Sequence, residues 1–206
     1  QRAYREFELF YYGLITAVYS TAFITIMPFI RIYTSGVTDI NYDLPMIGFL
    51  FVLNGLLFNI KTPQGMLVIS AGLFKETKFQ TTIQGLIVVI VGIILAPFLG
   101  IVGVLIGSIL SNIYRDIDLL FFISKNVTKL SVRKSAYRII RIFMSIVVIW
   151  IPFLFITINS TNYLLWMANT AIVSLFASVL VMAINFIFER SDMLNIGKRI
   201  FRMVKR

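Results

Sequence analysis

Six apolar stretches, each close to the length that crosses a lipid bilayer, constrain this chain more than any other feature of its sequence. The stretch at 163–188 contains no charged residue. A helix needs about 20 apolar residues to cross the hydrocarbon core of a bilayer. Of the 206 residues, 59% are hydrophobic and 14% are charged, which is more apolar side chain than a soluble domain of this size can bury. The sequence therefore predicts an all-α fold, a polytopic membrane helical bundle of about six transmembrane helices.

The predicted spans are separated by short polar segments and lie within a single membrane domain over 1–206. They cover residues 10–30, 44–72, 80–97, 100–123, 138–158 and 163–188. Because so few residues join the third span to the fourth, we expect these two spans to form an antiparallel hairpin. Gly103, Gly107 and Ser111 follow one another at four-residue spacing, which lets another helix approach closely. The stretch from 189 to 206 is expected to be a basic amphipathic segment that meets anionic lipid headgroups.

The basic residues predict an orientation in the membrane. If the N-terminus is cytoplasmic, the inner regions are the N-terminus and the segments 61–78, 114–141 and 189–206. Of the 19 Lys and Arg residues, Arg31 alone lies outside these regions. Since the Lys and Arg content of loops sets orientation, both ends of this chain are predicted on the cytoplasmic side. The net charge of +10 does not indicate a nucleic-acid partner, because the basic residues lie between apolar runs rather than on one polar face.

The residue types that carry most enzymatic chemistry are scarce. The chain contains no cysteine and no histidine, which removes thiolate metal ligands and the commonest general base. It has no nucleophile elbow, phosphate-binding loop or dinucleotide-binding glycine pattern. Most acidic residues are expected in loops or at span ends, so the spans offer no obvious paired carboxylates or carboxylate proton carrier. We therefore predict a protein that is not an enzyme, with no catalytic residue, no metal site and no cofactor.

The second span carries the candidate binding site. Residues 44–72 would extend about 43 Å as a helix, longer than the bilayer core of about 30 Å. Pro63 is expected to kink or break that helix, because it lacks a backbone donor and clashes with the preceding turn. Asn54 and Lys61 are seven positions apart and therefore share a helix face. The candidate substrate-binding residues of this span are Asn54, Asn59, Lys61 and Gln64.

Two interpretations of Lys61 are open from the residues alone. A Lys at the centre of a membrane helix costs about 2.5–3.5 kcal/mol, so it needs a partner or an aqueous cavity, where it could attract a phosphate. Alternatively, its ammonium group reaches the headgroups at the inner interface. The Asn side chains could equally bridge neighbouring helices.

Two arginines are candidate gate residues. Arg31 could gate the outer side or pair with Asp39 or Asp43. Arg115 could gate the inner side or form a local ion pair at a solvated helix end.

Several segments together resemble one known family. They are PFIRIYTSGVTD at 28–39, KTP at 61–63, SAGLFKETK at 70–78, GIVGVLIG at 100–107 and NIYR at 112–115. In this order they are similar to the polysaccharide biosynthesis transporters, the O-antigen and capsule repeat-unit flippases. These belong to the superfamily that also holds multidrug exporters and oligosaccharidyl-lipid flippases. The resemblance covers roughly residues 1–125.

This resemblance implies a two-lobed helical transporter that works by alternating access around a central cavity. The chain would form most of the second lobe, and the remaining N-terminal lobe of the same protein would be its partner. The implied substrate is an undecaprenyl-diphosphate-linked oligosaccharide, moved across a bacterial cytoplasmic (inner) membrane for lipopolysaccharide or capsule synthesis. Lys61 best matches the basic cavity residues that would meet the diphosphate. Membrane lipids and other polysaccharide-assembly proteins are the further partners expected.

Three alternatives to a flippase are open. A multidrug exporter of the same superfamily would have a cavity rich in acidic and aromatic groups. A membrane-embedded enzyme of polysaccharide synthesis would need acidic or arginine-rich outer loops, and the outer loops here are short and poor in both. A purely structural membrane subunit is the third alternative.

Overall fold

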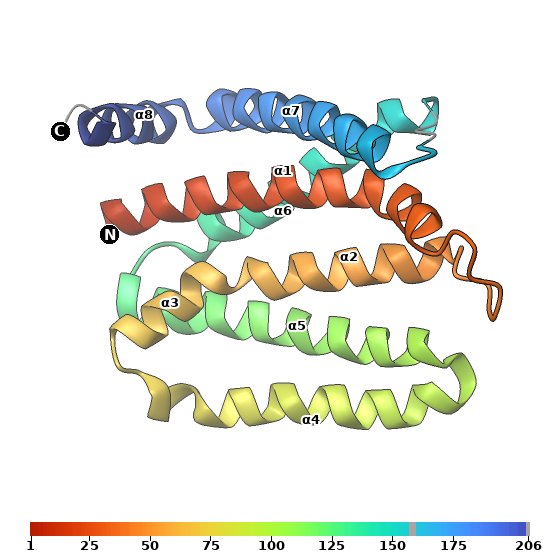
Figure 1. Ribbon diagram of the computed structural model, residues 1–206. Helices are drawn as coiled ribbons and strands as arrows, with labels where there is room; N and C mark the ends of the chain where they lie inside the picture. The colour runs from red at the N-terminus through yellow and green to blue at the C-terminus, as the bar shows by residue number, and fades with distance from the viewer. Residues whose placement is uncertain (157–159, 205–206) are drawn as a thin grey trace. The chain divides into compact units, whose positions relative to one another are not determined.

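The computed structural model describes the backbone at 1–156 and 160–204, and the side chains at 1–156 and 160–199. In this part the chain forms helices and no strand (Figure 1), so the all-α prediction is confirmed. The chain divides into two compact units. Unit 1 holds residues 1–44 and 138–206, and unit 2 holds residues 45–137. The single membrane domain over 1–206 stays a prediction.

The chain is a membrane protein with several spans. Among the described residues, 5 helical segments are long and apolar enough to cross a bilayer: Arg2–Tyr33, Pro45–Ser70, Phe74–Leu99, Val132–Leu154 and Tyr163–Phe188. The fourth predicted span is not one of these segments. It corresponds to α5 (Ile101–Ile123), a helix of 23 residues whose carboxyl-terminal half carries Arg115, Asp116 and Asp118.

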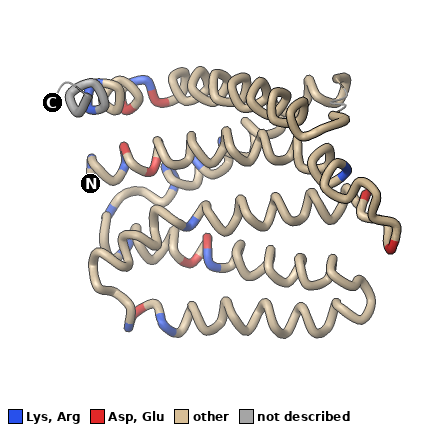
Figure 2. The backbone as a smooth tube through the Cα atoms, in the orientation of Figure 1, with Lys and Arg blue, Asp and Glu red and all other residues tan. Residues whose placement is uncertain are grey.

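Unit 1 is built on α1 (Arg2–Tyr33), which packs against α7 (Tyr163–Phe188) and α8 (Arg190–Val204). Its helix α6 (Val132–Trp150) continues into a 3-10 turn at Ile151–Leu154. The core of the unit joins α1, α6 and α7 through Ala17, Ile149, Ala177 and Val181. The α7 tube is tan along its length in Figure 2, as expected of a helix whose surface faces lipid.

The helices of unit 1 differ from the predicted spans mainly at their ends. The span predicted at 10–30 covers only the apolar part of α1, which begins at Arg2. Its extra turns are supported by side-chain bonds at helical spacing, from Arg2 to Glu6 at 3.0 Å and from the Tyr4 hydroxyl to Glu8 at 3.0 Å. The seventh helix matches the predicted span 163–188, and the Asn162 side chain caps it by accepting from the Leu165 N–H at 2.8 Å.

The remaining differences lie at the fifth span and the tail. The helix α6 begins at Val132, six residues before the predicted start at 138. The predicted end of that span at Ile158 lies outside the described residues. The basic tail forms the helix α8, and its last two residues, Lys205 and Arg206, also lie outside the described part.

Unit 2 is centred on α5, which packs against α2 (Pro45–Ile60), α3 (Thr62–Ser70) and α4 (Phe74–Leu99). The break predicted at Pro63 is present, because α2 ends at Ile60 and α3 begins at Thr62 with Pro63 in its first turn. The helix α3 then ends before Gly72, whose φ of 66° is the left-handed conformation common after a helix. After α5 the chain forms one π-helical turn at Ser124–Thr128.

The predicted hairpin of the third and fourth spans is confirmed. Gly100 alone connects α4 to α5, with φ 57° and ψ −135°, a conformation that favours glycine. The stripe of small residues allows the close approach of these helices. A Cβ atom added at Gly103 would lie 2.6 Å from the Leu95 carbonyl carbon, and one added at Gly107 would lie 3.1 Å from the Gly92 nitrogen.

One expected loop is helical. The residues 75–78 were predicted to lie in an inner loop before a span at 80–97, but they form the first turn of α4, which begins at Phe74. The Thr77 hydroxyl donates to the Leu73 carbonyl at 3.1 Å, which satisfies one acceptor at this helix start. The prediction was wrong because charged residues end an apolar run without ending a helix.

Candidate functional site

A cluster of polar side chains joins α2 to α5 within unit 2. The Asn54 carboxamide oxygen accepts from Asn112 Nδ2 at 2.9 Å and from the Ser108 hydroxyl at 2.8 Å. The Lys61 ammonium group donates to Asn112 Oδ1. Asn54 and Lys61 therefore meet the same residue of the neighbouring helix, as their shared helix face predicts.

Helix α4 also contributes a side chain to this cluster. Gln84 Nε2 donates to Asn112 Oδ1 at 3.4 Å. Asn112 is 4% exposed, so the shared partner of the cluster is buried. We call Asn54, Lys61, Gln84, Ser108 and Asn112 the polar cluster.

Two residues of the polar cluster, Asn54 and Asn112, lie near the middle of their helices. At 1.5 Å per residue, Asn112 is about 17 Å from the start of α5 at Ile101. Asn54 is about 14 Å from the start of α2 at Pro45 by the same measure. A bilayer core of about 30 Å would therefore hold both residues far from either surface.

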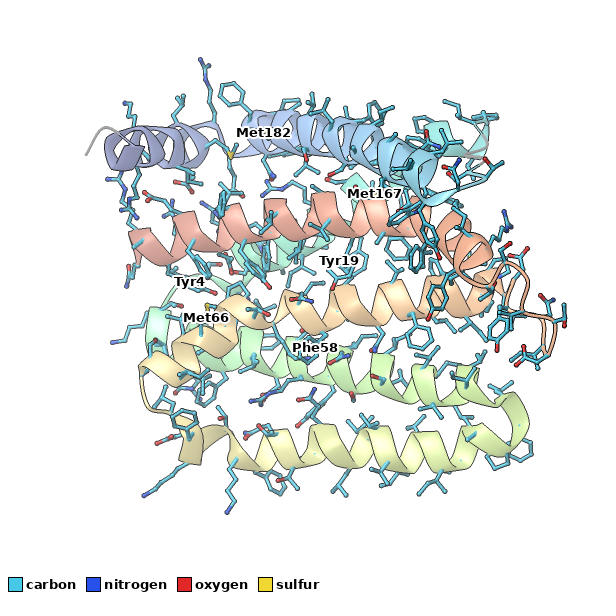
Figure 3. The ribbon with its side chains drawn as sticks, in the orientation of Figure 1. Tyr4, Tyr19, Phe58, Met66, Met167 and Met182 are labelled. Carbon is cyan, nitrogen blue, oxygen red and sulfur yellow. The ribbon has the colours of Figure 1, made fainter. Side chains whose placement is uncertain are left out.

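Lys61 occupies the interruption between α2 and α3. Its ammonium nitrogen lies 4.6 Å from the centre of the Phe58 ring, a residue of α2 labelled in Figure 3. Asp116, one turn beyond Asn112 on α5, interacts with Lys61 electrostatically. One Asp116 oxygen, Oδ1, is buried and has no hydrogen-bond partner among the described residues. Lys61 therefore has an amide, an aromatic face and an opposite charge around it.

The other two candidates of this span are placed differently. Asn59 Nδ2 donates to the Gly55 carbonyl of its own helix at 3.0 Å. Gln64 lies on α3, beyond the interruption, and is 3% exposed. The structure therefore brings Asn54 and Lys61 together through Asn112 and places Gln64 on the next helix segment.

Both candidate gate residues form ion pairs. Arg31 Nε lies 3.1 Å from the Asp43 carboxylate, and both side chains are exposed. Arg115 Nη1 lies 2.7 Å from Asp118 Oδ2, three positions along α5. The Arg115 side chain is 8% exposed, so the expected local pair is present but the solvated helix end is not. A gating role for either residue stays a prediction.

The sequence did not single out Ser108, Gln84 or Asn112 as site residues, and it suggested Asp116 only as part of a gate with Arg115. Asn112 and Ser108 are four positions apart on one face of α5, the same spacing that marked the glycine stripe. That spacing could have indicated a polar face. Most acidic residues were expected in loops or at span ends, and Glu6 and Glu8 do lie at the start of α1, before its apolar part, whereas Asp116 lies within α5.

A second charged cluster holds the helices of unit 1 together at one end. Arg138 on α6 is 1% exposed and donates to Glu8 at 2.6 Å, to Glu189 at 2.9 Å and to Asp192 at 3.4 Å. Arg141 Nη2 also donates to Glu189, at 2.6 Å. We call these five residues the Arg138 cluster.

The Arg138 cluster shifts the titration of Glu189. Burial alone would raise the pKa of Glu189, but hydrogen bonds and positive charge from Arg138 and Arg141 outweigh burial and lower the pKa to about 2. Glu189 is therefore ionised throughout the physiological range. Within the described residues, no group of three or more His, Cys, Asp or Glu could hold a metal ion.

The chain matches no protein-family model, no curated protein and no solved structure.

Proposed function

We propose that this chain is the C-terminal part of a flippase that moves undecaprenyl-diphosphate-linked oligosaccharides across the bacterial cytoplasmic membrane. The observation that carries the proposal is the position of Lys61, whose ammonium group bonds to the buried Asn112 of a neighbouring helix within the membrane-spanning part of unit 2. Ionisable residues in such positions are costly and mark substrate or ion pathways.

The contacts of Lys61 favour the cavity interpretation over the interfacial one. A Lys that reaches the headgroups extends its chain along its own helix towards the surface. Lys61 instead turns to Asn112, while Asn112 also bonds to Asn54 and Gln84. These contacts support an interpretation in which the ammonium group meets the anionic part of the substrate between the helices rather than the headgroups.

The polar cluster suits a substrate with an anionic link and a polar sugar. A diphosphate would be attracted by Lys61, and the Asn, Gln and Ser groups can replace water around sugar hydroxyls. The lipid tail would stay in the bilayer during transfer. No bond is made or broken, so a transporter needs no catalytic residue.

In this proposal the N-terminus and α8 are cytoplasmic, and the N-terminal lobe of the same protein faces this chain across the cavity. Alternating access would come from movement of one lobe against the other. The motif order over 1–125 supports this assignment.

The first test uses a bacterial strain in which the full-length protein can be depleted. The measurement is the amount and the leaflet of the lipid-linked oligosaccharides after depletion. The proposal expects complete repeat units to accumulate facing the cytoplasm, and re-expression of the wild-type protein to relieve this. Incomplete glycans would indicate an enzyme instead. An unchanged lipid pool with altered drug sensitivity would indicate a multidrug exporter.

A further inference from the structure

Helix α8 is attached to unit 1 by charges. Asp192 on α8 lies 3.1 Å from Arg5 Nη2 on α1 and 3.4 Å from Arg138 Nη2 on α6. Further along α8, Arg199 Nη1 lies 3.1 Å from Glu6 Oε2. An acidic residue of α8 thus pairs with a basic residue of α1, and a basic residue of α8 pairs with an acidic residue of α1. Figure 1 shows the two helices side by side at this end of unit 1.

Apolar packing contributes less than the ion pairs to this attachment within the described residues. Of the α8 side chains at 190–199, Asp192 is the only buried one, and the apolar Met193 and Ile196 are half-buried. Leu194, a large apolar residue of the same helix, is 47% exposed. By contrast, α7 is held to α1 by the buried apolar residues Ala17, Ala177 and Val181. Helix α7 is therefore held to α1 by apolar packing, whereas α8 is held mainly by ion pairs.

The docked helix α8 exposes basic side chains. Arg190, whose guanidinium lies 5.5 Å from the centre of the Phe186 ring, and Lys198 are exposed, and the Arg199 side chain is 56% exposed although it pairs with Glu6. The sequence from 190 to 204 places apolar residues at helical spacing between these basic residues. A helix with one apolar and one basic face is the kind that binds at the surface of an anionic bilayer.

The position of α8 brings such a surface within reach. The membrane-spanning helix α7 ends at Phe188, and α8 begins two residues later at Arg190. Arg190 is therefore close to the headgroups at this end of unit 1, while Lys198, eight residues further on, lies about 12 Å along the helix from it. Anionic headgroups attract juxtamembrane Lys and Arg residues over about a Debye length, roughly 8–10 Å.

We propose that α8 is an electrostatic strap that exchanges its ion pairs with α1 for binding to the anionic lipid surface. In the docked state Asp192 and Arg199 hold α8 on the first turns of α1. In the released state the basic residues of α8 face lipid phosphates and its apolar residues enter the headgroup boundary. The exchange depends on lipid charge and does not depend on the transported substrate.

The test follows the distance between α8 and α1 in bilayers of two compositions. The chain has no cysteine of its own, and any cysteine elsewhere in the full-length protein is first replaced by serine, so that spin labels attach only at cysteines introduced by Ala3→Cys and Gly197→Cys, both at exposed positions. The full-length protein is measured by pulsed electron spin resonance in nanodiscs of phosphatidylcholine alone and of phosphatidylcholine with phosphatidylglycerol. The strap predicts one short distance in the neutral bilayer and a second, longer distance that grows with the share of phosphatidylglycerol. A distance distribution that is the same in both bilayers would overturn the proposal.

Variants test the ionic docking separately. Asp192→Asn should raise the population at the longer distance in the neutral bilayer several-fold, because it weakens the pairs with Arg5 and Arg138. Asp39→Asn, in the exposed loop after α1, is the matched control and should leave the distribution unchanged. If Asp192→Asn leaves α8 as fully docked as in the parent protein, the docking is not ionic and the strap is refuted.

Discussion

Arg138 on α6 and Glu8 on α1 form an ion pair that is sealed from solvent, with Nη1 and Oε2 2.6 Å apart and side chains 1% and 2% exposed. Two buried charges are stable only when geometry and further hydrogen bonds compensate for lost hydration. Arg138 meets this condition by also donating to the Arg5 carbonyl at 3.0 Å and to Glu189 at 2.9 Å. Through Glu8 and Glu189, Arg138 thus joins the first part of α6 to the start of α1 and the end of α7. These are the segments predicted to share one side of the membrane.

Replacing Arg138 should destabilise the protein strongly. Arg138→Gln removes the buried guanidinium that donates to both Glu8 and Glu189, and breaking a buried ion pair typically costs about 3–5 kcal/mol. Arg133→Gln, on the same helix but exposed, should have little effect. Thermal unfolding of both variants in detergent gives the comparison. Equal stability of the two variants would show that the Arg138 cluster contributes nothing net.

The ionisation of Glu189 should make the free energy of unfolding depend on pH only below pH 4.5. Its pKa is lowered from 4.5 to about 2, so its ionised form stabilises the fold fully above pH 4.5. This contribution is lost as the pH falls from 4.5 towards 2. The difference in melting temperature between the parent protein and Glu189→Gln should therefore be constant from pH 7 to 5 and shrink below pH 4.5. A difference that already shrinks between pH 7 and 5 would contradict the lowered pKa.

The contact between α4 and α5 should not tolerate a methyl group at Gly103. The added Cβ of Gly103→Ala would lie 2.6 Å from the Leu95 carbonyl carbon, and such overpacking costs about 1–3 kcal/mol. Gly85→Ala on α4 is the matched control, since its Cβ would meet nothing within 4 Å. Unfolding midpoints should fall for the first variant and stay level or rise for the second.

Transport should depend on Lys61 more than on another lysine of unit 2. Lys61→Ala removes the cation from the polar cluster and should lower the rate of flipping roughly tenfold, which is about 1.4 kcal/mol. Lys129→Ala, in the turn between α5 and α6, should change it little. Both variants are compared at equal expression by the leaflet distribution of the lipid-linked oligosaccharide. Small and equal effects would return Lys61 to the interfacial interpretation.

The predicted topology can be tested independently of function. Reporters fused after Asn41 and Asn162 should be extracytoplasmic, and one fused after Lys129 should be cytoplasmic. Opposite reporter signals at any of these positions would break the positive-inside assignment.

The sequence predicted the helices well because each crossing requires a long apolar run, and such runs are visible without any tertiary information. It also predicted the break at Pro63 and the shared face of Asn54 and Lys61, since both follow from local helix geometry. The helix ends were predicted less well. Charged residues such as Arg2 and Lys75 ended an apolar run but were accommodated within α1 and α4.

The partners of the candidate residues depended on packing that local patterns do not contain. Asn112 completes the polar cluster because α5 turns that face towards α2, a rotation that no residue spacing in α2 determines. Likewise, Arg138 meets Glu8 and Glu189 from positions far apart in the chain. The charge pattern placed these residues at span ends, where solvated side chains are the ordinary expectation, and gave no sign that they are buried together.

The single glycine between α4 and α5 has a mechanical consequence. Because Gly100 alone connects the two helices, and their backbones approach closely near Gly103 and Gly107, we expect α4 and α5 to move together as one rigid pair. Gln84 and Asn112 lie on this pair and should keep their spacing when it tilts. A change in the angle between the pair and α2 would then alter the contact between Asn112 and the Lys61 ammonium group.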